Sequence, residues 1–232
     1  MKKFLVISPH PDDLDFGCAG TIAQLVSQGN EVDYLIVSDG SKGSQAVGFD
    51  GKKLSAIRER EQKNAAKVVG VTNVNFLRQT DGEVENTRAL RKKLVREIRK
   101  SKPDVVLSLD PSNLQFENIY RSHRDHRQVA EAVFDAIYPA VGSSAFFPEL
   151  LRQGLKPHQI QEIWFFATPN PNKFVDITKT INLKLKALSS HKSQFEHGKE
   201  LEKLILKRAK AQGRKKRMKY AEAFRVIDFK RH

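Results

Sequence analysis

The sequence has few of the features that secreted, membrane-spanning or disulfide-stabilised proteins depend on. It has one cysteine, Cys18, so no disulfide can form within the chain, and this favours a reducing cytoplasm. No apolar run approaches the roughly 18 residues that a transmembrane helix needs. The first residues, MKKFLVIS, contain too short an apolar run for a signal peptide and are typical of a first strand. We therefore expect a cytoplasmic protein without a membrane span.

Acidic residues are also scarce relative to basic ones, which leaves a formal net charge of +14. The excess is concentrated in residues 88–102, with eight Lys/Arg against one Glu, and 199–219, with ten against two. Apolar residues at helical spacing within 88–102 predict an amphipathic helix with a basic outer face. Such faces are either simply solvated or bind a polyanion. No aromatic residue interrupts 199–217 to stack on bases, which argues against nucleic acid.

Apolar runs and helix-period segments alternate along the chain. This pattern predicts an α/β protein with a mostly parallel, doubly wound sheet. We expect one domain over 1–232, with a core at 1–177 and C-terminal helices and a final strand at 178–232. The expected strands are 4–8, 32–37, 74–77, 104–110, 162–168, 174–177 and 223–229. The expected helices are 17–28, 54–69, 88–102, 124–138, 178–195 and 196–210.

Two polar clusters follow expected strands. HPDD, residues 10–13, comes directly after the first strand, and HRDH, residues 123–126, comes after the fourth. Ligands of open parallel sheets bind outside the carboxyl ends of the strands. The sequence therefore predicts that the two clusters lie close together at the C-terminal edge of the sheet.

The first cluster has the spacing of a metal site. His10 and Asp13 lie one helical turn apart, and His126 is the candidate third ligand. Two imidazoles and a carboxylate leave the fourth position of a catalytic zinc open for water, whose pKa the metal lowers to roughly 7. Asp12 is then free to act as general base, with Asp15 as a weaker rival. The alternative is a helix start, since proline and acidic residues favour that position.

The second cluster has a spare imidazole. With His126 on the metal, His123 lies one turn away and can stabilise the oxyanion of a tetrahedral intermediate. We expect Asp125 to hold the imidazole of His123 and to favour its charged form.

These motifs resemble those of the PIG-L/LmbE-like family of metal-dependent N-deacetylases. The resemblance rests first on PHPDD and HRDH. It extends to AIRERE at Ala56–Glu61, LKALSSHKSQ at Leu185–Gln194 and YAEAFRV at Tyr220–Val226. It therefore covers nearly the whole chain. Pro9 and Arg124 depart from the family's usual residues, although neither replaces a candidate ligand.

The resemblance implies a Rossmann-like, three-layer fold that binds no dinucleotide. It implies zinc on the three candidate ligands, Asp12 as the general base, and His123 polarising the acyl oxygen with Asp125 behind it. Arg58 would lie near polar groups of the substrate. Family substrates are mostly N-acetylglucosamine units attached to a lipid, a small acid, an inositol or another sugar.

We therefore expect a zinc-dependent N-deacetylase acting on an N-acetylated amino-sugar conjugate, with iron(II) as the alternative metal. The alternative function is a basic polyanion-binding module without catalysis. The loops at 40–53, 78–87 and 111–122 would select the group attached to the sugar. The apolar stretch Ala145–Leu151 would either join the core or form a contact between subunits of a homo-oligomer.

Overall fold

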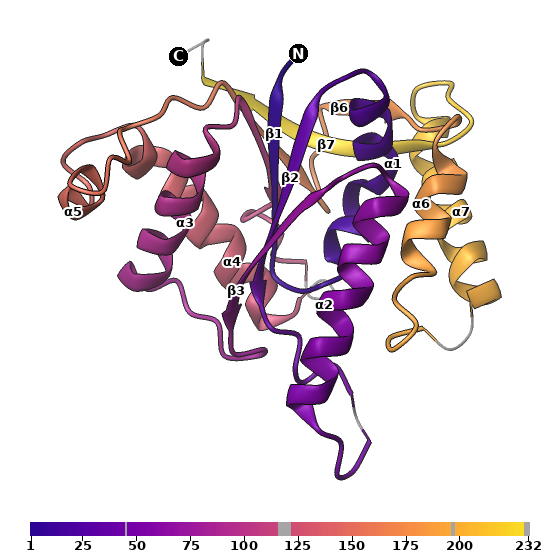
Figure 1. The fold of residues 1–232 in the computed structure, drawn as a ribbon. Coiled ribbons are helices and arrows are strands. Elements are labelled where there is room, and N and C mark those ends of the chain that lie inside the picture. Colours follow the sequence, from indigo (N-terminus) through magenta and orange to yellow (C-terminus); the bar gives the residue numbers. More distant parts are fainter. Residues whose placement is uncertain (45, 116–121, 196–197, 230–232) are drawn as a thin grey trace.

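The computed structural model, which describes residues 1–44, 46–115, 122–195 and 198–229, contains one seven-stranded sheet between two layers of helices (Figure 1). The strand order is β3-β2-β1-β4-β5-β7-β6. The first five strands are parallel, β7 runs antiparallel to β5, and β6 runs antiparallel to β7. The mostly parallel α/β fold expected from the alternation is confirmed. The strands are β1 (Lys3–Ser8), β2 (Glu31–Ser38), β3 (Asn73–Gln79), β4 (Val105–Leu109), β5 (Glu162–Phe166), β6 (Lys173–Asp176) and β7 (Ala221–Asp228).

The helices cover both faces of the sheet. One layer contains α1 (Asp13–Ser27), α2 (Gly51–Val68), α6 (Ile181–Leu188) and α7 (Gly198–Arg214). The other contains α3 (Arg88–Ser101), α4 (Arg124–Asp135), the kinked helical segment η1 (Ala136–Val141) and α5 (Pro148–Leu151). Successive strand residues point to opposite faces, so Val6 and Leu107 pack in one core while Leu5 and Val106 pack in the other. Within the described ranges, no helix is long and apolar enough to cross a membrane.

Apolar side chains of two predicted segments, 88–102 and 145–151, are buried between the helices and the sheet. The apolar face of α3 is buried, as its spacing predicts, and Arg99 is buried with it. The Arg99 guanidinium donates to the carbonyls of Ala140, Val141, Ser143 and Phe146, which joins α3 to the end of η1. In the stretch 145–151, Phe147 and Leu150 are buried in the core, so packing accounts for them.

Several helix boundaries differ from the sequence expectation, and two of them lie close to the polar clusters. Helix α1 begins at Asp13, the last residue of the first polar cluster, rather than at Gly17. The helix expected over 178–195 ends at Leu188. The chain turns there because the buried His191 forms a hydrogen bond with α1 and the exposed Ser193 forms two with Glu61 of α2. The expected start of the next helix, Glu196, lies outside the described residues.

A buried ion pair joins the C-terminal segment to α1. Lys184 on α6 lies 2.5 Å from Glu222 on β7, and both side chains are almost fully buried. Lys184 also donates to the carbonyl of Phe16, while Glu222 accepts from the backbone of Gly20 and Thr21. The pair thus connects α6, β7 and α1 behind the first polar cluster.

Replacing Lys184 with methionine is expected to lower the free energy of unfolding by about 3 kcal/mol, because Glu222 is left as a buried charge without its cation. Urea unfolding measures the change. Lys186→Met on the exposed side of the same helix is the control, with an expected change within about 0.5 kcal/mol. Equal losses of unfolding free energy in the two variants would contradict a stabilising role for the Lys184–Glu222 pair.

Candidate metal centre and active site

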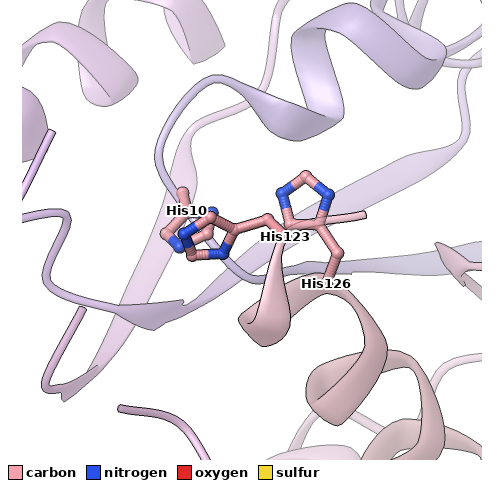
Figure 2. A group of neighbouring side chains, drawn as sticks. All are labelled: His10, His123 and His126. Carbon is pink, nitrogen blue, oxygen red and sulfur yellow. The ribbon is translucent and has the colours of Figure 1, made fainter. Parts of the chain in front are cut away.

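Two segments far apart in the sequence meet where adjacent parallel strands end. The chain leaves β1 at Ser8 and reaches His10 two residues later, and the loop after β4 leads to His123 and α4. Figure 2 shows the imidazoles of His10, His123 and His126 gathered together. The ring centroid of His10 lies 4.8 Å from that of His123 and 5.3 Å from that of His126. The predicted meeting of the two clusters is therefore present in the structure.

Asp13 lies between two of these imidazoles. Its Oδ2 is 3.2 Å from Nδ1 of His10, and its Oδ1 is 3.1 Å from Nε2 of His126. Burial raises the pKa of the Asp13 carboxyl, but the imidazoles of His126 and His10 outweigh that effect and hold it well below its usual value. The structure thus brings together all three residues predicted as metal ligands.

The other nitrogen of His10 faces two further carboxylates. Nε2 lies 3.0 Å from Oδ1 of Asp81 and 3.1 Å from Oδ2 of Asp125. Burial lowers the pKa of His10, yet hydrogen bonds to Asp125, Asp13 and Asp81 raise it well above its ordinary value overall. With Nε2 occupied by carboxylates, Nδ1 is the nitrogen directed toward Asp13. Carboxylates behind a metal-binding histidine commonly fix its ring and tautomer in this way.

The donor set fits a divalent cation. The imidazoles of His10, His123 and His126 offer ligand atoms that all lie within 4.8 Å of one another, and so do His10, Asp81 and Asp125. The carboxylates of Asp12 and Asp13 lie beside them, so buried negative charge accumulates at one place. Nitrogen and oxygen donors of this kind bind zinc or iron. The site can therefore hold a metal ion. Which of these residues bind it stays a prediction.

Asp12 has a different environment from Asp13. Its carboxylate Oδ2 lies 3.3 Å from the Arg58 guanidinium rather than against an imidazole. Burial raises the pKa of Asp12 to about 6, and Arg58 opposes part of that rise. Asp15, the rival for the role of base, is fully buried and hydrogen-bonded to Gln62 and His191 instead. The two adjacent aspartates thus have separate surroundings, as their predicted roles require.

The prediction for Asp125 is corrected by the structure. Its carboxylate accepts from His10 and from the backbone of Gly82 and Val84, and only its backbone N–H contacts His123, at 3.2 Å from Nδ1. Burial and the nearby His10 lower the pKa of His123 and outweigh the attraction of Asp125. His123 is therefore favoured as a neutral imidazole. Because Nδ1 accepts a hydrogen bond, Nε2 carries the proton.

Arg58 lies behind the site rather than in front of it. The side chain is buried, and its guanidinium donates to the carbonyls of Gly40 and Pro11 and to the Asp12 carboxylate. Its role as a substrate-binding residue stays a prediction, whereas its contact with Asp12 is direct.

Sequence reasoning missed Asp81. This residue is buried, contacts His10 and accepts from the backbone of Lys42, and the imidazolium of His10 contributes to lowering its pKa to about 2 despite burial. It lies just after β3, in the QTDGEVEN loop. The rule that located the other two clusters, polar residues in the loop that follows a parallel strand, also applies to Asp81.

A cavity of about 420 Å³ opens beside the two aspartates. Asp12 and Asp13 line one part of it, and apolar side chains such as Phe16 and Phe166 line another. Helix α7 contributes Arg208 and Gln212 to its wall. The space next to the candidate metal centre is therefore large enough to admit part of a small organic molecule.

The strand order, the cluster at the carboxyl edge and the cavity define a Rossmann-like α/β protein with a candidate metal-dependent hydrolase site. The model of the PIG-L family, GlcNAc-PI de-N-acetylase, matches residues 5–137. The chain belongs to this family, which confirms the resemblance seen in the motifs.

Individual relatives agree with the family. The chain is 40% identical over 195 residues to a diacetylchitobiose deacetylase of Thermococcus kodakarensis, covering 84% of this chain and 71% of the relative. It is 27% identical to a probable N-acetyl-alpha-D-glucosaminyl L-malate deacetylase of Bacillus anthracis, covering 84% and 82%. The structure of N,N'-diacetylchitobiose deacetylase from Pyrococcus horikoshii superposes with a TM-score of 0.91 at 35% identity, covering 98% of this chain and 84% of that one.

These relatives are deacetylases of substrates that contain N-acetylglucosamine. They support an N-deacetylase, an amidohydrolase acting on a non-peptide carbon–nitrogen bond, over the polyanion-binding alternative.

Proposed function

We propose that this protein removes the acetyl group from an N-acetylglucosamine-type amide, with zinc as its metal and Asp12 as general base. The observation that supports this most directly is the separation of two adjacent carboxylates. Asp13 contacts the imidazoles of His10 and His126, while Asp12 contacts Arg58. These contacts support Asp13 as a ligand of the cation and Asp12 as the acceptor of a proton.

His10, Asp13 and His126 would hold the zinc ion, and the same ligands accept iron(II). When bound, the metal would supply Lewis acidity that activates water and polarises the acyl oxygen. Asp81 and Asp125 hold the ring of His10 from behind. These two carboxylates keep Nδ1 of His10 on the side of Asp13.

The remaining steps use protein side chains. Asp12 accepts the proton of the attacking water, and it then donates that proton to the departing nitrogen as the carbon–nitrogen bond breaks. His123 donates from Nε2 to the acyl oxygen as negative charge develops on it. The products are acetate and the free amino sugar.

The substrate we propose is a short N-acetylglucosamine oligosaccharide, since two relatives at 35–40% identity are named for diacetylchitobiose. The cavity beside Asp12 gives a second sugar unit room next to the reacting amide. Phe16 offers apolar surface there for the face of a sugar ring.

A panel of N-acetylglucosamine conjugates tests the proposal. The purified protein is incubated with N,N'-diacetylchitobiose, the malate conjugate and the inositol conjugate, and released primary amine is measured. We expect amine from the disaccharide first, and loss of activity on chelation with recovery on added zinc. Chelator-insensitive amine release would contradict the metal assignment. Release from none of the conjugates would contradict the substrate class.

A further inference from the structure

The backbone of Asp12 has an unusual conformation. Its φ is 99° and its ψ is −35°, a region that residues with a side chain rarely adopt. Such a conformation costs about 1–3 kcal/mol and persists only where the surroundings impose it. Asp12 stands at the start of α1, yet its side chain does not cap the helix. Contacts to the backbone and to the side chain of Asp12 can both offset this strain.

Gln62 of α2 supplies the contact to the backbone. The side chain is fully buried, and its Oε1 accepts from the Asp12 backbone N–H at 2.8 Å. Its Nε2 donates to Oδ2 of Asp15 at 2.9 Å. Because the carboxylate of Asp15 can only accept here, the Gln62 amide is oriented in one way, with its oxygen toward Asp12.

The C-terminal segment completes this chain of hydrogen bonds. His191, fully buried in the turn after α6, donates from Nε2 to the same oxygen of Asp15 at 2.8 Å. Two residues later Ser193 donates from its backbone and hydroxyl to Glu61, at 2.8 and 2.6 Å. The SSHKSQ turn is thus fastened to α2 at one point and to α1, through Asp15, at another.

Helix α2 contacts both ends of Asp12. Arg58 and Gln62 are four residues apart and therefore lie on one face of the helix. Arg58 reaches the carboxylate, and Gln62 reaches the backbone N–H. A rotation of the Asp12 backbone toward an ordinary conformation would break the second contact and redirect the first.

We propose that Gln62, oriented by Asp15 and His191, is a positioning residue that holds the Asp12 backbone so that its carboxylate faces the scissile amide. This inference rests on the proposed function of Asp12 as the general base. The SSHKSQ motif then contributes to the active site through His191, although none of its residues needs to touch the substrate.

The first test is Gln62→Met, which keeps the bulk of the side chain and removes both hydrogen bonds. We expect kcat to fall by about a hundredfold through misplacement of the base. KM should stay within about twofold, and bound zinc should be unchanged. The control is Ser193→Ala, which weakens the neighbouring attachment of the same turn without touching the Asp15–Gln62–Asp12 chain, and its kcat should stay within about threefold.

Two substitutions at His191 provide the second test. His191→Gln retains a donor for Asp15 and should keep most of the wild-type activity, whereas His191→Leu removes the donor and should lose activity. This pair decides the question if Gln62→Met does not fold. Equal activities of the glutamine and leucine variants, per folded molecule, would overturn the proposal.

Hydrogen exchange at the Asp12 amide is the readout that needs no activity. Gln62→Met should raise its exchange rate at least about tenfold over wild type, whereas Ser193→Ala should not. A variant with wild-type kcat and wild-type exchange at Asp12 would show that Gln62 is only a packing residue. If the wild type deacetylates none of the conjugates, the proposed function fails, and the exchange measurement still decides whether Gln62 holds Asp12.

Discussion

Replacing Asp12 with asparagine is expected to lower kcat by about a thousandfold while bound zinc stays near the wild-type level. Asparagine keeps the size of the side chain and an oxygen that can accept from Arg58, at 3.3 Å in the structure. It cannot take a proton from water or return one to the leaving nitrogen. Asp13, next in the chain, keeps its contacts with His10 and His126.

The measurement combines steady-state deacetylation with the zinc content of the purified variant. Asp104→Asn is the matched control, because it makes the same chemical change at the opposite edge of the sheet, just before β4, where Asp104 accepts from the backbone of Lys3. It should retain kcat within about threefold. If Asp12→Asn loses its zinc instead, the division of roles between the two aspartates is wrong.

Replacing Asp13 with alanine is expected to remove both metal and activity. The carboxylate is the one anionic member of the predicted ligand set, and it joins His10 to His126 through contacts of 3.2 and 3.1 Å. Without it, two imidazoles remain and the negative charge that favours the cation is reduced. We expect bound zinc to fall from about one to below about a tenth per chain, and kcat to fall at least about a thousandfold.

The variant His123→Ala distinguishes between two possible sets of metal ligands, one that includes Asp13 and one that includes His123. Its imidazole belongs to a group with His10 and His126 whose ligand atoms are close enough for a shared metal, yet we assign it to the acyl oxygen. Under that assignment the variant keeps its zinc and loses about a hundredfold or more in kcat. Zinc lost from His123→Ala but retained by Asp13→Ala would make His10, His123 and His126 the ligands.

Much of the architecture could be predicted because each buried strand and each amphipathic helix leaves a local pattern. The run FLVIS corresponds to β1, and the apolar spacing from Leu90 to Ile98 corresponds to the buried face of α3. The end of α6 could not be predicted. The residues after Leu188 are compatible with a helix, and what stops it is the attachment of His191 and Ser193 to helices elsewhere in the chain.

The candidate site, too, was predictable from the sequence in part only. Parallel strands end at one edge, so polar residues after β1 and β4 had to lie near one another. The partner of Asp125 was predicted wrongly, because its neighbour in sequence, His123, seemed the natural one, whereas the fold places His10 against its carboxylate. Asp81 was missed although it also follows a parallel strand, because its loop contains three acidic residues, Asp81, Glu83 and Glu85, and no histidine that would mark one of them as part of a site.

The sequence by itself determined the class of fold, the meeting of the HPDD and HRDH clusters and the family, because hydrophobic periodicity and short motifs involve residues that are close together in the chain. Only the tertiary structure decided which buried polar atoms pair. Asp15 and His191 are 176 residues apart, and Gln62 is 50 residues from Asp12. Such pairs form because a buried donor must find an acceptor within hydrogen-bonding distance, and which acceptor lies there depends on how the loops and helices pack.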